Sequence, residues 1–138
     1  MKSLFPAILL STSLIFCDQS FAAFKSDQEI LLSLKKYSAA DMKQGNDHMA
    51  DVLLQVNDAV QYELTHSKST KVVREILRVS LLTLNQDPTL AVADILAPLY
   101  SKDKKFFENA LQSLPKSTAR TLLKAIKNSL REEKSGNG

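Results

Sequence analysis

Apolar residues recur every three or four positions along most of the chain. One series comprises Ile30, Leu31, Leu34 and Tyr37, and a second runs from Met49 to Leu64. Apolar side chains at these intervals line one face of an α-helix. No stretch alternates convincingly between apolar and polar residues, which is the pattern of a half-buried β-strand. The spacing therefore predicts an all-α protein.

Capping and turn-forming residues divide this pattern into about six helices. Ser26 and Glu29 form a capping box, so the first helix is expected to begin at Asp27. It is expected to run to about Gln44 because Gly45 can adopt the left-handed conformation that ends a helix. The other helices are predicted from Asn46 or Asp47 to about His66, from about Lys71 to Asn85, from Pro88 to Ala97, from Ser101 through Leu111, and from Pro115 to near Glu133.

The third and fourth predicted helices are the most apolar. The third is apolar around most of its circumference in its second half, and the fourth is apolar on every side apart from Asp94. Asp87 is expected to cap the fourth helix, and Ser101 the fifth. Pro98 is expected to end or kink the fourth helix because proline has no amide hydrogen. We expect these two helices to form the core of a compact bundle or orthogonal array.

The first 22 residues differ from the rest of the chain. Lys2 precedes an apolar run from Leu4 to Phe16, and the segment closes on Ser20, Phe21 and Ala22. This arrangement is typical of a signal peptide that is cleaved after export, here after Ala22. The run is shorter than the roughly 20 apolar residues of a spanning helix, so no transmembrane segment is expected in the mature chain. We therefore predict a periplasmic or secreted protein.

Cleavage would leave one helical domain at residues 23–133 and a short disordered tail at 134–138. A chain of this length suits a single domain with its own core. Cys17 is the only cysteine and lies in the predicted signal peptide, so the mature chain would contain no disulfide. Lipidation of Cys17 is a minor alternative, because no small residue directly precedes it. The lack of an Asn-x-Ser/Thr sequon weakly favours a bacterial envelope.

Positive charge forms the sharpest polar pattern of the mature chain, whose sequence carries a formal net charge of +3. Five cations recur on the last predicted helix at spacings of four, four, three and four, with no acidic residue among them. These spacings place them on one face, about a quarter-turn from the apolar row of the same helix. We call this set the basic stripe: Lys116, Arg120, Lys124, Lys127 and Arg131.

The basic stripe is a candidate site for an anionic partner. An envelope or secreted protein with an acidic surface, an anionic membrane surface or another polyanion would relieve the repulsion between neighbouring cations. The alternative is a solvated face that only favours the negative end of the helix dipole. Nucleic acid is not an expected ligand, because export removes the chain from most such targets and no aromatic residues are interleaved with the cations.

Two smaller clusters suggest site chemistry less strongly. His48 and Asp51 lie one turn apart, and Asp47 is adjacent. A metal site usually needs three or four ligands, so a solvated acidic first turn is the preferred interpretation. No metal or cofactor is therefore expected. Asp94 is the only charged residue between Pro88 and Tyr100.

A carboxylate in such an apolar stretch would have a raised pKa unless it were paired. Arg74 and Arg78 on the preceding helix are possible partners for Asp94, so a structural ion pair or a partly exposed carboxylate is expected rather than a catalytic acid.

Sequence motifs of common enzyme classes are missing: there is no phosphate-binding glycine loop, nucleophile elbow or zinc-binding helix. Paired carboxylates drawn from Glu63, Glu75 and Glu108 stay open as a hydrolase alternative. We expect a non-enzymatic binding protein that engages a partner protein through a helical groove or the basic stripe. A small hydrolase of envelope polymers and a peripheral binder of anionic surfaces are the alternatives.

Overall fold

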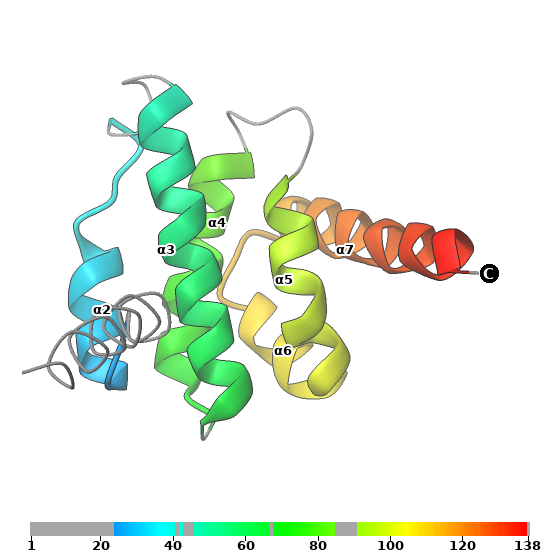
Figure 1. Cartoon of the computed structure of the whole chain (residues 1–138), viewed down its shortest axis with the longest axis horizontal. Coiled ribbons are helices and arrows are strands. Elements are labelled where there is room, and N and C mark those ends of the chain that lie inside the picture. Colours follow the sequence, from blue (N-terminus) through cyan, green and yellow to red (C-terminus); the bar gives the residue numbers. More distant parts are fainter. Residues whose placement is uncertain (1–23, 41, 43–45, 67, 85–90, 138) are drawn as a thin grey trace, which may run out of the picture.

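The computed structural model describes residues 24–40, 42, 46–66, 68–84 and 91–137. These residues form six α-helices and no β-strand, so the predicted all-α class is confirmed (Figure 1). The helices are α2 (Asp27–Lys35), α3 (Asn46–Thr65), α4 (Thr70–Leu84), α5 (Ala91–Lys102), α6 (Lys104–Leu111) and α7 (Lys116–Asn137). No helix within the described ranges is long and apolar enough to cross a membrane. The predicted signal peptide, Cys17, Gly45, Asp87 and Pro88 lie outside the described residues.

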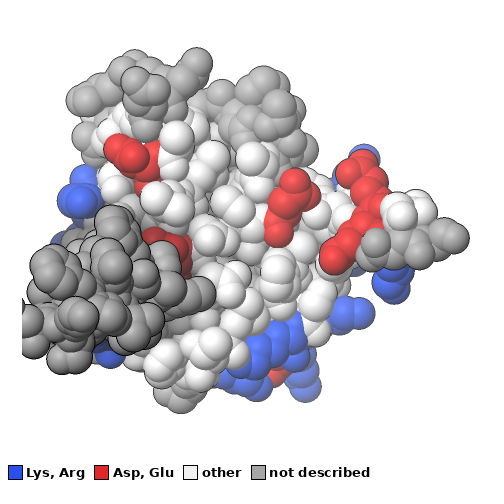
Figure 2. All heavy atoms as spheres, in the orientation of Figure 1, with Lys and Arg blue, Asp and Glu red and all other residues white. Residues whose placement is uncertain are grey.

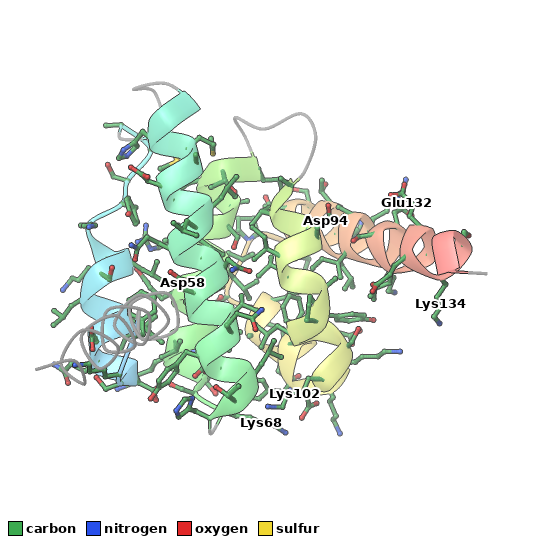
Figure 3. All side chains as sticks on the ribbon, in the orientation of Figure 1. Asp58, Lys68, Asp94, Lys102, Glu132 and Lys134 are labelled. Carbon is green, nitrogen blue, oxygen red and sulfur yellow. The ribbon has the colours of Figure 1, made fainter. Side chains whose placement is uncertain are left out.

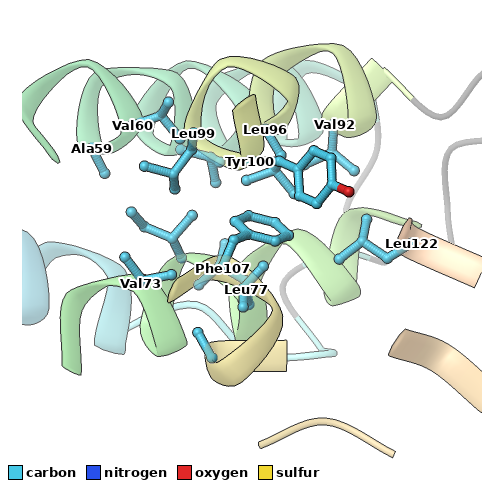
Figure 4. Close-up of a cluster of buried hydrophobic side chains, with 14 of the residues drawn as sticks. Ala59, Val60, Val73, Leu77, Val92, Leu96, Leu99, Tyr100, Phe107 and Leu122 are labelled. Carbon is cyan, nitrogen blue, oxygen red and sulfur yellow. The ribbon is translucent and has the colours of Figure 1, made fainter. Parts of the chain in front are cut away.

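Helix α4 lies at the centre of the bundle, where it contacts each of the other five described helices. Helix α5 contacts α3, α4, α6 and α7. Val73 and Leu77 of α4 belong to a buried apolar cluster with side chains of the surrounding helices (Figure 4). In the same cluster, the rings of Tyr100 and Phe107 meet edge to face with their centroids 5.6 Å apart. The predicted third and fourth helices therefore do supply the centre of the core.

The second half of α4 is less apolar on its inner side than its sequence indicates. Leu81, Leu82 and Leu84 are only half-buried, whereas Ser80 and Thr83 are fully buried. Ser80 Oγ donates to the Ile76 carbonyl at 2.6 Å, and Thr83 Oγ1 donates to the Ser80 carbonyl at 2.7 Å. Because their own helix satisfies both hydroxyl groups, they can be buried without a further partner.

Helix α2 begins where the sequence indicates but ends earlier. Ser26 Oγ accepts a hydrogen bond from the Glu29 amide at 3.2 Å, and the Glu29 carboxylate accepts one from the Lys25 amide instead of the Ser26 amide. The prediction that this helix reaches Gln44 is wrong, because it ends at Lys35.

A side chain from another helix occupies the end of α2. Arg78 of α4 donates from Nη2 to the Leu34 carbonyl and from Nη1 to the Tyr37 carbonyl, each at 2.9 Å. These bonds satisfy carbonyl groups that a continuing helix would have paired with its own amides. The chain leaves the helix at this point, and the Met42 side chain, 4% exposed, joins the core.

Two expectations about α5 and α6 are also wrong. Helix α5 does not end at Ala97 but continues through Pro98 to Lys102, and Ser101 lies inside it. Leu99 and Tyr100, which follow Pro98, are buried, and their burial offsets the hydrogen bond that proline cannot donate. Helix α6 is capped instead by Asp103, whose side chain accepts from the Phe106 amide at 3.0 Å.

Helix α7 is longer than predicted. It begins at Lys116, directly after Pro115, and reaches Asn137 instead of ending near Glu133. The predicted tail from residue 134 is thus helical as far as Asn137. No proline follows Lys116, and Gly136 is the first glycine after it, so nothing in this sequence breaks the helix earlier.

Candidate binding groove along helix α7

The turn between α6 and α7 sets the direction of α7. The Leu114 amide donates to the Leu111 carbonyl at 2.9 Å, and the Ala119 amide donates to the Pro115 carbonyl at 2.9 Å. Helix α7 then packs mainly on α5 and also touches α4. Leu122, Ala125 and Ile126 are its buried apolar side chains. Burial of this row fixes which side of α7 faces away from the core.

All five residues of the basic stripe are exposed. The two ion pairs found among the described residues, Lys68 with Asp103 and Arg78 with Glu75, do not involve the stripe. The acidic residues of α7, Glu132 and Glu133, are also exposed and come after Arg131 in the helix. The cations therefore project into water along the first two-thirds of the helix.

Two hollows run along this side of α7. The first has a volume of about 550 Å³ and lies between α6, the α6–α7 turn and the start of α7; the second, of about 340 Å³, lies farther along α7. They share Arg120 and Leu123, and together they are lined by all five stripe cations. We call the two hollows together the α7 groove. Its lining also includes Glu108, Leu111, Gln112, Leu114, Ala119 and Asn128.

The lining combines apolar and cationic groups. Leu111 is buried, and Leu114, Ala119 and Leu123 are half-buried, so their apolar atoms are accessible only in part. Glu108 is the only acidic side chain among the described residues that line the groove. Such a surface suits a ligand that offers an apolar group and several anionic groups together. The sequence indicates the cations, but the contribution of α6 depends on the angle at Pro115 and could not be read from periodicity.

Asp94 does not form the expected ion pair with Arg74 or Arg78. It is exposed in the first turn of α5 and accepts a hydrogen bond from Ser129 Oγ of α7. Arg78 instead points toward the end of α2 and donates from Nε to Glu75 Oε1 at 2.9 Å. Arg78 and Asp94 have different neighbours because α4 directs Arg78 toward α2, whereas α5 directs Asp94 toward α7. The partly exposed carboxylate that was also expected is what the structure contains.

The start of α3 does not assemble a metal site in the described part of the chain. The His48 ring lies edge-on to the Tyr37 ring, with their centroids 5.9 Å apart, whereas the Asp51 side chain is exposed. The Asp47 side chain lies outside the described atoms. No three described His, Cys, Asp or Glu side chains are close enough together to hold a metal ion.

The three carboxylates considered for hydrolysis occupy three different environments. Glu63 is 2% exposed, and its Oε1 accepts from the Ser69 amide at 3.1 Å. Burial, followed by the nearby charge of Asp27, raises the pKa of Glu63 to about 7. Glu75 pairs with Arg78, and Glu108 lines the α7 groove.

The hollow beside Glu63 is too small for a polymer substrate. Its volume of about 10 Å³ is comparable to the space that one water molecule requires. Lys68, Lys102 and Phe106 are among the side chains that close it. Sequence reasoning did not predict that Glu63 is buried. The one signal is that α3 contains no Lys or Arg to pair with it. The arrangement is that of a structural carboxyl group at the end of α3.

The α7 groove thus combines room for a ligand with a concentration of positive charge. No protein family, curated protein or solved structure matches this chain.

Proposed function

We propose that the mature chain is an exported, non-enzymatic binding protein that holds an acidic segment of a partner protein in the α7 groove. One observation carries this proposal: five exposed cations line two adjoining hollows that also present apolar side chains. The signal-like sequence of residues 1–22 supports the exported location, and with it a partner in the periplasm or outside the cell.

The charges of the groove favour an acidic partner. Neighbouring cations at spacings of three and four residues repel each other by a few tenths of a kcal/mol, and carboxylates placed between them remove this repulsion. Each exposed ion pair contributes only about 0.2–1 kcal/mol, so charge alone gives weak binding. Binding by this surface is therefore expected to weaken steeply as salt screens the cations.

The apolar lining supplies the second part of the binding energy. Transfer of one leucine side chain from water into a fully apolar site contributes about 1.5–3 kcal/mol. Leu114, Ala119 and Leu123 offer partly exposed apolar atoms to such a side chain. A helical segment with a leucine between acidic residues one turn before and after it matches both parts of the groove.

Fluorescence anisotropy with a labelled amphipathic peptide of this pattern tests the proposal. Replacement of the five stripe cations by Gln is expected to weaken peptide binding by about tenfold or more, the sum of several pairs of about 0.3 kcal/mol. The matched control replaces five exposed cations outside the groove by Gln and thus changes the net charge equally: Lys35, Lys71, Arg74, Lys104 and Lys105.

Equal loss of binding in the two variants would mean that only net charge matters, and the groove proposal would be wrong. Vesicles that contain anionic lipid provide a second arm. Binding of the wild type to these vesicles but not to the peptide would replace the proposal with the peripheral membrane alternative. Circular dichroism establishes that both variants remain helical.

A further inference from the structure

Helix α3 carries the opposite charge pattern to α7. It contains acidic residues but no Lys or Arg. Asp51 is exposed, Leu54 is 59% exposed, and Asp58 is half-buried. These three residues are separated by three and four positions and so lie on one face of the helix. We call them the acidic stripe. An exposed leucine is ordinary by itself, but here a carboxylate lies one turn before it and another one turn after it.

The α7 groove contains the complementary set at the same spacing. Arg120, Leu123 and Lys127 are also separated by three and four positions. Both sets span about 10 Å of helix. A parallel α3–α7 pairing that packs Leu54 on Leu123 brings Asp51 to Arg120 and Asp58 to Lys127. An antiparallel pairing brings Asp51 to Lys127 and Asp58 to Arg120. Each acid then lies about 1.5 Å, the rise of one residue, from the level of its cation along the helix.

The two stripes belong to different parts of one molecule. Helix α5 lies between α3 and α7 (Figure 1). In the same orientation, acidic side chains are spread across the viewed face as far as its right end, whereas Lys and Arg lie mainly along its edges (Figure 2). Asp58 on α3 and Asp94 on α5 belong to this face, and Lys68 and Lys102 lie at its lower edge (Figure 3). The acidic stripe of a molecule can therefore meet the α7 groove only of another molecule.

We propose that the acidic segment held in the α7 groove is helix α3 of a second copy of this chain. This inference rests on the proposed function, because it names the partner of the same groove. The pairing joins two different surfaces, so a pair of molecules keeps one free α3 and one free groove, and assembly continues into a chain or closes into a ring. The contact includes few apolar groups, so association is expected to be weak and sensitive to salt.

Sedimentation of the full mature chain tests the pairing. The average mass is expected to rise with protein concentration at low ionic strength and to return to that of the monomer at about 0.5 M salt. Leu54→Ser is expected to weaken association at least about fivefold, since it removes an apolar group of the contact. Lys71→Gln, a change at an exposed site on α4, is the control and is expected to leave the average mass unchanged.

A charge exchange gives the sharper test. The first variant, Asp51→Lys/Asp58→Lys, presents cations on α3 as well as in the groove. The second, Arg120→Glu/Lys127→Glu, presents carboxylates on α3 and at the two groove positions that pair with it. Each variant alone is expected to stay monomeric, whereas an equimolar mixture is expected to associate, because each surface then meets the opposite charge. If the first variant fails to fold, Asp51→Asn/Asp58→Asn replaces it. This variant alone is expected to stay monomeric, and its mixture with the second variant is expected to form pairs only, because the one complementary contact left is between the unchanged α3 of the second variant and the unchanged groove of the first.

The results separate this inference from the proposed function. A wild type that stays monomeric up to about 1 mM at low salt would overturn the self-association. The self-association would also be overturned if either charge-exchanged variant, measured alone, associated as strongly as the wild type. If the wild type is monomeric but binds the acidic peptide, the groove still has a partner and only its identity is wrong. If it neither associates nor binds the peptide, both proposals fail.

Discussion

Helices α3 and α7 are the two longest described helices, and they differ in where their charged side chains lie. Helix α7 leaves every cation of the basic stripe in water and is held to the bundle by its apolar row. Helix α3 buries Glu63 and thereby brings an ionisable group into the core. The comparison shows that similar amphipathic sequences can place charge at a surface, where it is available to partners, or in a core, where it makes folding depend on pH.

The largest expected effect tests what holds α7 in place. Leu122 is fully buried and Leu123, its neighbour, lines the groove. Leu122→Ala is expected to lower the free energy of unfolding by about 3 kcal/mol, through lost burial and the cavity left behind. Leu123→Ala is expected to cost clearly less stability but to weaken peptide binding. Urea denaturation and anisotropy measure the two effects, and equal losses of stability would mean that α7 has no distinct groove side.

A smaller effect is expected at the buried acid of α3. Glu63→Gln keeps an acceptor for the Ser69 amide but cannot ionise. The pKa of Glu63 is raised from 4.5 to about 7 in the folded chain. Below pH 4.5 the wild-type group is protonated in both states, so it causes no pH-dependent loss. Between the two pKa values only the unfolded chain ionises, and the wild type loses stability as pH rises.

The gain from Glu63→Gln is therefore expected to grow from pH 4.5 and to level off above about pH 7, where it reaches about 2–3 kcal/mol. Urea denaturation across this range measures it. Asp27→Asn is the matched control: it removes the nearby charge that helps to raise the Glu63 pKa, so the window is expected to move to lower pH. A gain independent of pH would show that Glu63 does not titrate in this window.

The smallest expected effect concerns a single cation of the groove. Lys124 lies between Arg120 and Lys127 on the exposed side of α7. Lys124→Gln is expected to raise the free energy of unfolding by a few tenths of a kcal/mol at low salt, since it removes repulsion along the helix. The gain is expected to vanish at about 1 M salt, where charges are screened. A loss of stability at low salt would show that Lys124 has a stabilising partner within the molecule.

The sequence predicted those features that depend on local spacing. The periodicity of α4 and α5 identified the centre of the core, and the regular cations of α7 identified the exposed stripe. Features that depend on contacts between residues far apart in the chain could not be predicted from the sequence. Helix α2 ends where Arg78 donates hydrogen bonds to the Leu34 and Tyr37 carbonyls. Helix α5 continues through Pro98 because the residues that follow it, Leu99 and Tyr100, are buried. The first hollow of the groove is lined by residues of α6 and α7 together, and the repeat within one helix cannot predict which residues of another helix lie beside it.

The bond from Arg78 to Leu34 spans 44 positions of the chain. The end of α2 therefore cannot be completed until α4 has been made and has packed beside it. In a chain that emerges with its N-terminus first, the segment after residue 22 stays without this closing contact for roughly the first half of synthesis. The N-terminal end of the bundle is therefore completed by a residue from the middle of the sequence, and its order depends on the packing of α4.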